Sequence, residues 1–348
     1  MHIRISFFIF TMMKKYYLFI LIASFLCSTA AFAQQDATQL QDNAKAFMMD
    51  GDYSNAILLL NKAQQIRPND IEITKDIALN YYLGKDNDKA LAAIKPTLDR
   101  ADADDQCYQI AGNIYKEMDA PDDCDKLYKK GLKKFPKSGP LYNDYGELLS
   151  EQHDILNSIV QWEKGIEVDP GYSKNYYNAC KYYYLSGNSV WCIIYAETFA
   201  DMEPLNPESP EIKDILMESY KKLFSNIDLL KANTDKNKFT IAFLETMNKQ
   251  TDVTMSGINP ETITMIRTRF ILDWFKNYAD KFPFRLFDYQ RQLLQAGMFD
   301  AYSQWLFGSV QNLAAYQNWT NTHADEYNAF DRFQRGRTFK IPAGQYYK

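Results

Sequence analysis

The chain has 348 residues, 46% of them apolar, which is enough to bury an extensive core in two structural regions. Tyr and Phe are abundant (25 and 22) while Gly and Pro are scarce (14 and 12), a balance that favours helices over a turn-rich β fold. The formal net charge of −5 lacks the basic footprint of a general nucleic-acid binder. Composition therefore points to a helical protein and away from nucleic-acid partners.

The first residues have the features of a secretory signal peptide. Lys14 and Lys15 precede an apolar core over residues 16–26, and an Ala-x-Ala cleavage site ends at Ala33. We expect cleavage after this site, so that residues 1–33 are removed. The mature protein is then exported, and we expect it in the periplasm or associated with the cell envelope.

Two alternatives exist for this segment. An uncleaved membrane anchor would need a longer apolar run, and the run here carries a cleavage site. A lipid on Cys27 would need small residues before it, where the sequence has Phe25 and Leu26. We therefore expect a mature chain with no stable membrane span.

From Ala37 to Asn206, residues match in kind at a spacing of 34, over five consecutive units with no insertion. A small residue recurs in the first half of each unit: Ala44, Ala78, Gly112, Gly146 and Cys180. A second small residue recurs in the second half: Ala56, Ala90, Cys124, Ser158 and Cys192. A larger apolar residue follows four positions later: Leu60, Ile94, Tyr128 and Trp162, with Ala196 as the exception. Pro ends four of the units: Pro68, Pro136, Pro170 and Pro204, with Asp102 in the second unit.

This pattern resembles the tetratricopeptide-repeat (TPR) family, whose consensus has a small residue in each helix, an aromatic residue after the first and Pro at the end. The resemblance implies an all-α fold, a TPR α-solenoid in which antiparallel helix pairs form a right-handed superhelix. One pair cannot bury its apolar face alone, so neighbouring pairs must stack on it. Phe199 stands where a small residue is usual, which indicates a packing change near the end of the array.

The register is lost after residue 206, and residues 207–348 predict atypical helical hairpins that continue or cap the solenoid. Ser209 and Pro210 predict a helix start, with Ser209 as N-cap and Pro210 as first residue. Apolar periodicity predicts further helices over residues 239–247, 260–281, 284–296 and 299–319. Residues 339–342 are expected to pack as an extended arm.

The sequence contains no H-E-x-x-H, G-x-S-x-G or Walker motif. The mature chain has His153 and His323, and neither has a partner motif, so a solvated helical His is favoured over a catalytic one. No C-x-x-C or Cys/His cluster indicates zinc. We therefore expect no enzymatic activity, no metal and no other cofactor.

In the TPR family, ligands lie along the concave face formed by the first helices. Transferring those positions onto this sequence implies a groove lined by Lys45, Lys75, Tyr82, Gln109, Asn113, Asn143, Lys174, Tyr177, Lys181 and Tyr184. Tyr offers contact area with little rotamer entropy to lose, and the amides and ammonium groups suit a peptide. The implied function is an exported scaffold or adaptor that binds a protein or peptide partner.

Two questions stay open. Cys180 and Cys192 occupy the two small positions of the fifth unit, where the helices come closest, so a disulfide and two free thiols chosen for size both fit. The competing functional hypothesis places an enzymatic or glycan-binding site in the C-terminal helical region, built from its Trp and Tyr residues. A smooth groove favours the scaffold, and a deep pocket with converging carboxylates favours the alternative.

Overall fold

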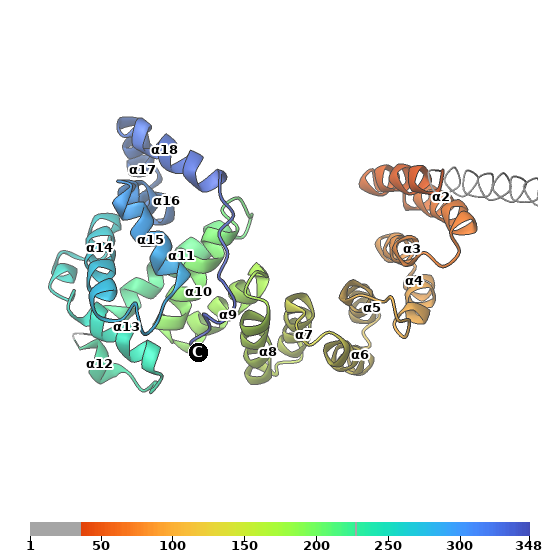
Figure 1. Ribbon diagram of the computed structural model, residues 1–348, viewed down its shortest axis with the longest axis horizontal. Helices are drawn as coiled ribbons and strands as arrows, with labels where there is room; N and C mark the ends of the chain where they lie inside the picture. Colours follow the sequence, from red (N-terminus) through yellow and green to blue (C-terminus); the bar gives the residue numbers. More distant parts are fainter. Residues whose placement is uncertain (1–35, 227) are drawn as a thin grey trace, which may run out of the picture. The chain divides into compact units, whose positions relative to one another are not determined.

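The computed structural model describes residues 36–226 and 228–348, so the predicted signal peptide lies outside this part of the chain. Within it, all regular secondary structure is helical (Figure 1). The chain divides into two compact units, one ending at Tyr128 and the other beginning at Lys129, inside helix α6 (Pro121–Lys134). This border lies within the repeats, and the spacing of 34 residues between helix starts ends after α10 (Ser189–Met202).

The helices of the repeats come in pairs. The first unit contains a helix over residues 36–49, then α2 (Tyr53–Ile66), α3 (Ile71–Leu83), α4 (Asn87–Ile94) with η1 (Lys95–Thr97), α5 (Asp105–Glu117) and the start of α6. The second unit continues with α7 (Gly139–Glu151), α8 (Ile155–Val168), α9 (Ser173–Ser186) and α10 (Ser189–Met202). From α3 onward, each first helix begins 34 residues after the previous one, and from α2 onward so does each second helix.

The turn inside each pair contains one residue in the left-handed conformation, again at a spacing of 34. These residues are Gly51, Lys85, Asp119, His153 and Gly187, with φ between 52° and 82°. Glycine adopts this conformation without strain, whereas a residue with a Cβ does so at a steric cost. His153, expected on a solvated helix, instead forms one of these turns, which gives it a structural place in the repeat.

Helix starts repeat with the same period. The second helices α2, α4, α8 and α10 follow N-caps whose side chains accept a hydrogen bond from the backbone N–H three residues on: Asp52, Asp86, Asp154 and Asn188. The first helices α3, α5 and α7 follow Asp70, Asp104 and Ser138, which cap them similarly. Because these oxygens satisfy amide groups that the helix leaves unpaired, they fix where each helix begins.

The small residues of the repeat make room for large ones. A Cβ on Gly112 would lie 2.2 Å from the Tyr128 hydroxyl, and a Cβ on Gly146 would lie 2.3 Å from Nε1 of Trp162. In the first two repeats the larger residue is aliphatic, Leu60 or Ile94, and Ala stands at the corresponding small position. The size of one residue thus follows the size of its partner, as close packing requires.

Beyond residue 206 the helices lose this period. They are α11 (Ser209–Leu223), α12 (Leu229–Ala232), α13 (Lys238–Asn248), η2 (Val253–Ser256), α14 (Pro260–Asn277), α15 (Arg285–Gln295), α16 (Phe299–Gln311), α17 (Leu313–Thr322) and α18 (Ala324–Arg335). Two predictions were wrong in detail. Ser209 is not an N-cap, because its hydroxyl donates to the carbonyl of Glu203 at 2.7 Å. The helix expected over residues 299–319 is broken at Asn312, which turns extended and caps α17.

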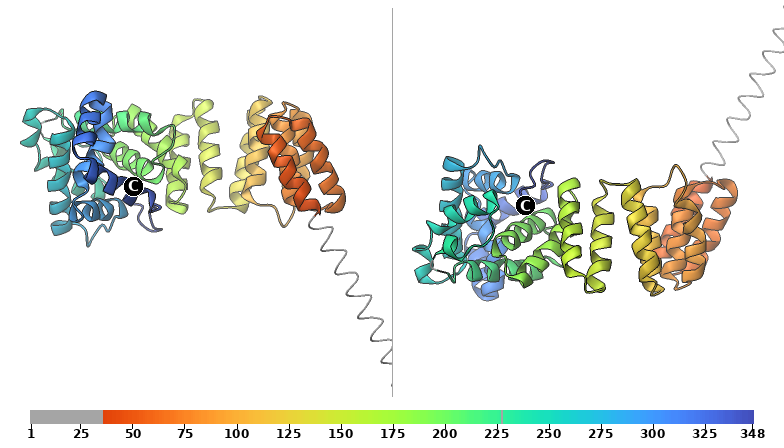
Figure 2. Two further views of the ribbon diagram at one scale, coloured as in Figure 1. Left: turned by 90° about the horizontal axis from the view of Figure 1, so that it is seen from above. Right: turned by 90° about the horizontal axis from the view of Figure 1, so that it is seen from below.

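The C-terminal arm lies across this region and is held at several points. Phe339 and Ile341 are buried, and the Tyr347 ring stacks on Phe239 at a centroid distance of 4.9 Å. The Asn237 amide donates to the Tyr347 carbonyl at 2.6 Å. The chain then ends beside α9 and α10, as Figures 1 and 2 show, with the Lys348 ammonium 5.5 Å from the Tyr183 ring centroid. The predicted arm is therefore present and packed.

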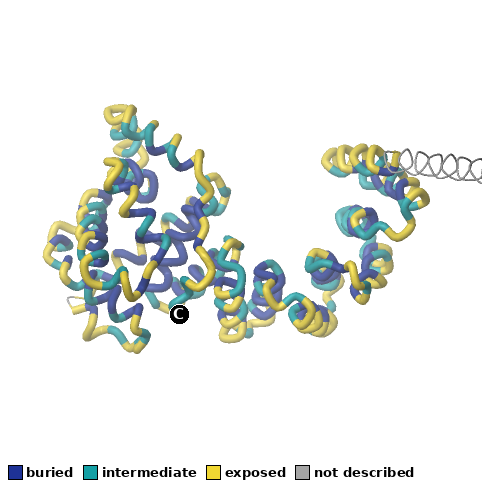
Figure 3. The backbone as a smooth tube through the Cα atoms, viewed as in Figure 1, coloured by how far each residue is buried: buried dark blue, intermediate teal, exposed yellow. Residues whose placement is uncertain are grey.

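A buried polar network joins helices that are distant in sequence. Arg267 of α14 forms an ion pair with Glu197 of α10, and both side chains are 1% exposed. Gln290 of α15 also donates to Glu197, at 2.6 Å, and the Tyr302 hydroxyl of α16 lies 2.7 Å from it. The same hydroxyl lies 2.9 Å from Asp201, whose pKa is raised by burial and by the charge of Glu197. Figure 3 shows buried backbone concentrated around this part of the second unit.

Candidate functional site

The predicted groove residues of the first compact unit differ in exposure. Lys45 is exposed, and Tyr82, Gln109 and Asn113 are half-buried. Lys75 is 4% exposed, and its ammonium contacts Asp104 at 2.6 Å and Glu72 at 2.7 Å. Although burial lowers the pKa of Lys75, these carboxylates raise it overall.

Lys75 therefore does not line a groove. It connects α3 to the N-cap of α5, because Asp104 is also the residue that caps α5. The sequence prediction assigned Lys75 to the groove only from its position in the repeat. Its ion-pair partner Asp104 belongs to the next repeat, which that position does not reveal. We remove Lys75 from the candidate site.

In the second unit, the predicted residue Asn143 of α7 is buried as well. Its amide donates to Glu147 at 3.0 Å and its oxygen accepts from Asn178 of α9 at 2.9 Å. Asn178 also lies 3.3 Å from Glu147. These bonds hold α7 and α9 together, so Asn143 supports the surface from below and is not itself a contact residue.

The predicted α9 residues lie next to α11. The Tyr177 hydroxyl donates to Glu211 at 2.8 Å, and the Lys181 ammonium pairs with the same carboxylate at 3.0 Å. Hydrogen bonds from Tyr177 and Lys181 lower the pKa of Glu211. Tyr184 is half-buried against the core, and Lys174 is exposed. The sequence pattern placed Tyr177 and Lys181 together but did not show their partner Glu211, which lies beyond the repeats.

Helices α7, α8 and α9 border one cleft, which we call the α7–α9 cleft. Its volume is ≈ 530 Å³, and it is lined by Glu147, Ser150, Glu151, Ile155, Trp162, Asn178, Lys181, Tyr182, Leu185 and Ser186. Of the predicted groove residues, Lys181 lines it and the others do not. A cleft of this size falls within the range of binding pockets in proteins.

Two apolar side chains make this cleft unusual. Leu185, near the end of α9, is 83% exposed, and Ile155, at the start of α8, is 42% exposed. Single exposed apolar residues are common, but apolar residues gathered at a concave surface are typical of interaction sites. Sequence reasoning missed both residues because they fall outside the positions that the family consensus assigns to ligands. The available signal was a leucine outside the packing positions of its repeat, two residues before the Gly187 that ends α9.

Cys180 and Cys192 face each other inside the fifth helix pair. Their sulfur atoms are 3.9 Å apart and buried, which is contact distance and well above the length of a disulfide bond. The Ser219 hydroxyl of α11 lies 3.0 Å from the Cys192 sulfur. In this structure both residues are free thiols that pack as small apolar side chains.

Two further properties bear on chemistry. Across residues 36–226 and 228–348, no three or more His, Cys, Asp or Glu side chains gather to hold a metal ion. In the same residues, no helix combines the length and apolarity needed to cross a bilayer.

The period of the helix starts, the left-handed turn in each pair and the small-to-large packing define the chain as a TPR α-solenoid that ends in atypical helical hairpins. No protein-family profile matches the sequence, and no curated protein matches it. Among solved structures, the chain is similar to PilF of Pseudomonas aeruginosa, with 12% identity and a TM-score of 0.46, covering 57% of this chain and 89% of that one.

Two other solved structures have the same kind of similarity. A thermophilic TPR protein of Thermus thermophilus has 13% identity and a TM-score of 0.41, covering 54% of this chain and 98% of that one. A TPR protein of Parabacteroides merdae has 12% identity and a TM-score of 0.40, covering 68% of this chain and 92% of that one.

Proposed function

We propose that this protein is an exported scaffold that binds a segment of another protein in the α7–α9 cleft. The observation that carries the proposal is the cleft itself, where Leu185 and Ile155 stay exposed beside a wall of hydrogen-bonded first-helix residues. Burying these two side chains against a partner would remove apolar surface from water, which is the main favourable term in protein association.

The occupant that suits this cleft is a short helix or extended segment with one apolar anchor. Trp162 and Ile155 supply apolar contact, and Asn178 and Ser150 offer hydrogen-bonding groups at the sides. Glu147 and Glu151 border the cleft against one Lys181, so a basic residue next to the apolar anchor would be electrostatically favoured.

The wall of the cleft is held in place before any partner arrives. Asn143, Glu147 and Asn178 are hydrogen-bonded to one another, and Lys181 is paired with Glu211. A surface that is already ordered loses less conformational entropy on binding than a mobile one. This preorganisation favours a defined partner segment over nonspecific adhesion.

Export belongs to the same proposal. Its support is the order of positive, apolar and cleavage regions in residues 1–33, which indicates a signal peptide. We infer that the mature scaffold acts in the periplasm or at the cell envelope. N-terminal sequencing of the exported protein tests this point, and a chain beginning at Cys27 with a lipid attached would overturn it.

The test of binding uses the full chain and compares proteins captured from envelope extracts by the wild type, by Leu185→Glu and by Leu272→Glu. Leu272 of α14 is 63% exposed. Both variants therefore replace an exposed leucine of the second compact unit with a charged residue, and both should fold normally. We expect Leu185→Glu to lose a partner that Leu272→Glu retains. If both variants retain every partner, the cleft is not the binding site.

A further inference from the structure

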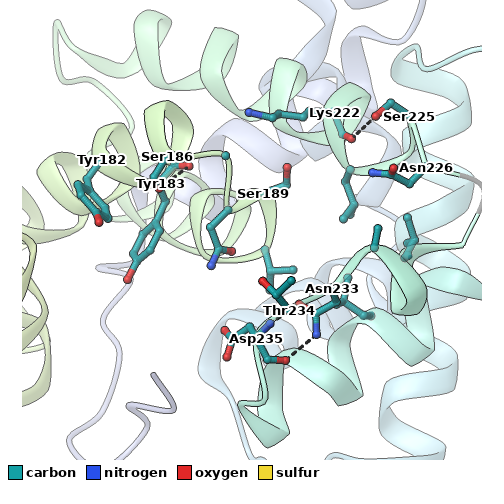
Figure 4. A pocket seen from close by; sticks show the side chains of 17 residues that line it. Tyr182, Tyr183, Ser186, Ser189, Lys222, Ser225, Asn226, Asn233, Thr234 and Asp235 are labelled. Atoms are coloured by element: carbon teal, nitrogen blue, oxygen red, sulfur yellow. Dashed lines mark hydrogen bonds between the residues drawn. The ribbon is translucent and has the colours of Figure 1, made fainter.

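A second cleft lies on the other side of the α9 end, and its lining is of a different kind. It has a volume of ≈ 510 Å³ and lies between the α9–α10 turn, the end of α11 up to Asn226, α12, and residues 233–235 before α13. Figure 4 shows three groups of residues around this cleft. Ser186 and Ser189 belong to the first, Lys222, Ser225 and Asn226 to the second, and Thr234 and Asp235 to the third. We call it the α9–α12 cleft.

Some of its polar side chains are already satisfied by local turns. The Asn233 amide donates to the Asp235 carbonyl at 2.6 Å, and the Ser225 hydroxyl donates to the Lys222 carbonyl at 2.8 Å. The Asp235 carboxylate accepts from the Asn237 N–H at 2.9 Å and from the Thr240 hydroxyl at 3.1 Å. These bonds fix the backbone of the cleft and leave little capacity for a ligand.

Other side chains keep their capacity. Within the described residues, the Ser189 and Thr234 hydroxyls, the Asn226 amide and the Lys222 ammonium have no side-chain hydrogen bond or ion pair, and the Asn188 NH₂ is likewise free while its oxygen caps α10. They come from three separate segments and border one hollow. Hydroxyls both donate and accept, and amide and ammonium groups donate, so together they suit a ligand that carries many hydroxyl groups.

The lining also argues against an apolar occupant. An apolar side chain in this cleft would remove water from these polar groups without replacing its hydrogen bonds, which costs free energy at each group. The Tyr182 ring at the rim gives one flat apolar surface of the kind that stacks against the face of a sugar ring. Lys222 is the one cation in the lining, so it is the group that can contact an acidic group of a ligand.

From this arrangement we propose that the α9–α12 cleft, which shares Tyr182 and Ser186 with the α7–α9 cleft, binds a short oligosaccharide, neutral or acidic. The hydroxyl groups of the oligosaccharide would form hydrogen bonds with Ser189, Thr234 and Asn226. Lys222 would contact a ring hydroxyl or a carboxylate of the sugar. The volume suits a ligand of two or three sugar units.

The test is calorimetric titration of the full chain with maltotriose, triacetylchitotriose and trigalacturonate. We expect saturable binding of at least one of them, weakened about tenfold by Thr234→Val, which removes a hydroxyl at nearly constant shape. Lys222→Met should weaken it similarly, and most for trigalacturonate. The matched control is Lys221→Met, because Lys221 is the adjacent residue and pairs with Glu218 outside the cleft.

Three results would overturn the proposal: no binding of any of the three sugars at millimolar concentration, binding that survives both cleft variants, or equal losses in Lys221→Met. Leu185→Glu separates this proposal from the first one. It should leave sugar binding unchanged, because Leu185 lines the α7–α9 cleft and not this one.

Discussion

The repeats and the region after residue 206 are both helical, but they are held together differently. In the repeats, contacts are local and periodic: Gly146 accommodates Trp162 within one helix pair, and Lys75 bonds to Asp104 of the next. The region after residue 206 is joined to the last repeat helix by an ion pair between Arg267 of α14 and Glu197 of α10, which lie 70 residues apart. The repeats use the same short-range contacts again and again, whereas the other region includes a buried polar network between helices that are distant in sequence.

The difference predicts how each region responds to change. In a solenoid, stability is approximately a sum of unit and neighbour terms, so damage stays local. A buried ion pair shared by several helices concentrates the effect, because removing one partner leaves a charge in an apolar interior. The C-terminal region should therefore be more sensitive to one substitution than any single repeat.

The largest expected effect is that of Arg267→Met. It keeps the bulk of the side chain but leaves Glu197 buried without its cation, at a cost of about 3–5 kcal/mol. Urea unfolding followed by Trp fluorescence measures it. Arg269→Met is the matched control on the same helix, since Arg269 is 46% exposed and pairs with an exposed Asp252. Equal stability of the two variants would contradict the role assigned to the network.

Next in size is Gly146→Ala in the fourth repeat. The added Cβ would lie 2.3 Å from the rigid Trp162 ring, so the helices must separate, at a cost of about 1–3 kcal/mol. Gly171→Ala is the control, because its Cβ would make an ordinary 3.5 Å contact with Asp169. Thermal melts of both variants compare them. If the Gly146→Ala variant is as stable as Gly171→Ala, the close contact between Gly146 and Trp162 does not determine how the two helices of the repeat pack.

A smaller effect is expected from Asp201→Asn. Burial and the charge of Glu197 raise the pKa of Asp201, so the folded state holds this proton more tightly than the unfolded chain does. The stability that protonated Asp201 contributes is therefore fully present below pH ~3.9, which is the pKa of an aspartate in the unfolded chain. It is lost as pH rises through the raised pKa of the folded state. The variant keeps an acceptor for Tyr302 without a charge.

We therefore expect Asp201→Asn to be more stable than the wild type by about 1 kcal/mol at neutral pH and to lose this advantage near pH ~4. Free energies of unfolding measured across this range test the sign. An advantage that grows as pH falls would contradict it.

The smallest effect concerns Cys180 and Cys192. Because both pack as small apolar groups with their sulfurs 3.9 Å apart, we expect them to remain thiols in the exported protein. Thiol titration of the denatured, unreduced chain lacking residues 1–33 should count all four cysteines. A count lower by two would show that oxidation joins this pair.

Much of the repeat region could be predicted from sequence because its contacts are local and recur. The same period also contains the caps at Asp52, Asp86 and Asp154 and the left-handed turn at His153, which the small and large positions alone did not indicate. The fold of the repeats therefore follows from residues spaced by 34.

The site could be predicted only in part. Lys181 and Tyr177 share Glu211 as a partner, but of the two only Lys181 lines the α7–α9 cleft, and Lys75 and Asn143 are buried against partners in the following repeat. A family consensus marks helix faces and does not show such specific pairs. The Glu197 network leaves no trace in the sequence, because nothing periodic connects residues 70 to 105 positions apart.

The central claim is that a protein partner occupies the α7–α9 cleft. The most direct measurement places a photoreactive side chain at Leu185 or, as control, at Leu272 in the full chain, then identifies adducts formed in the envelope by mass spectrometry. We predict an adduct from position 185 in which the attached segment carries an apolar residue next to a basic one, and none from position 272. Adducts from position 272 alone, or the same adducts from both positions, would contradict the account.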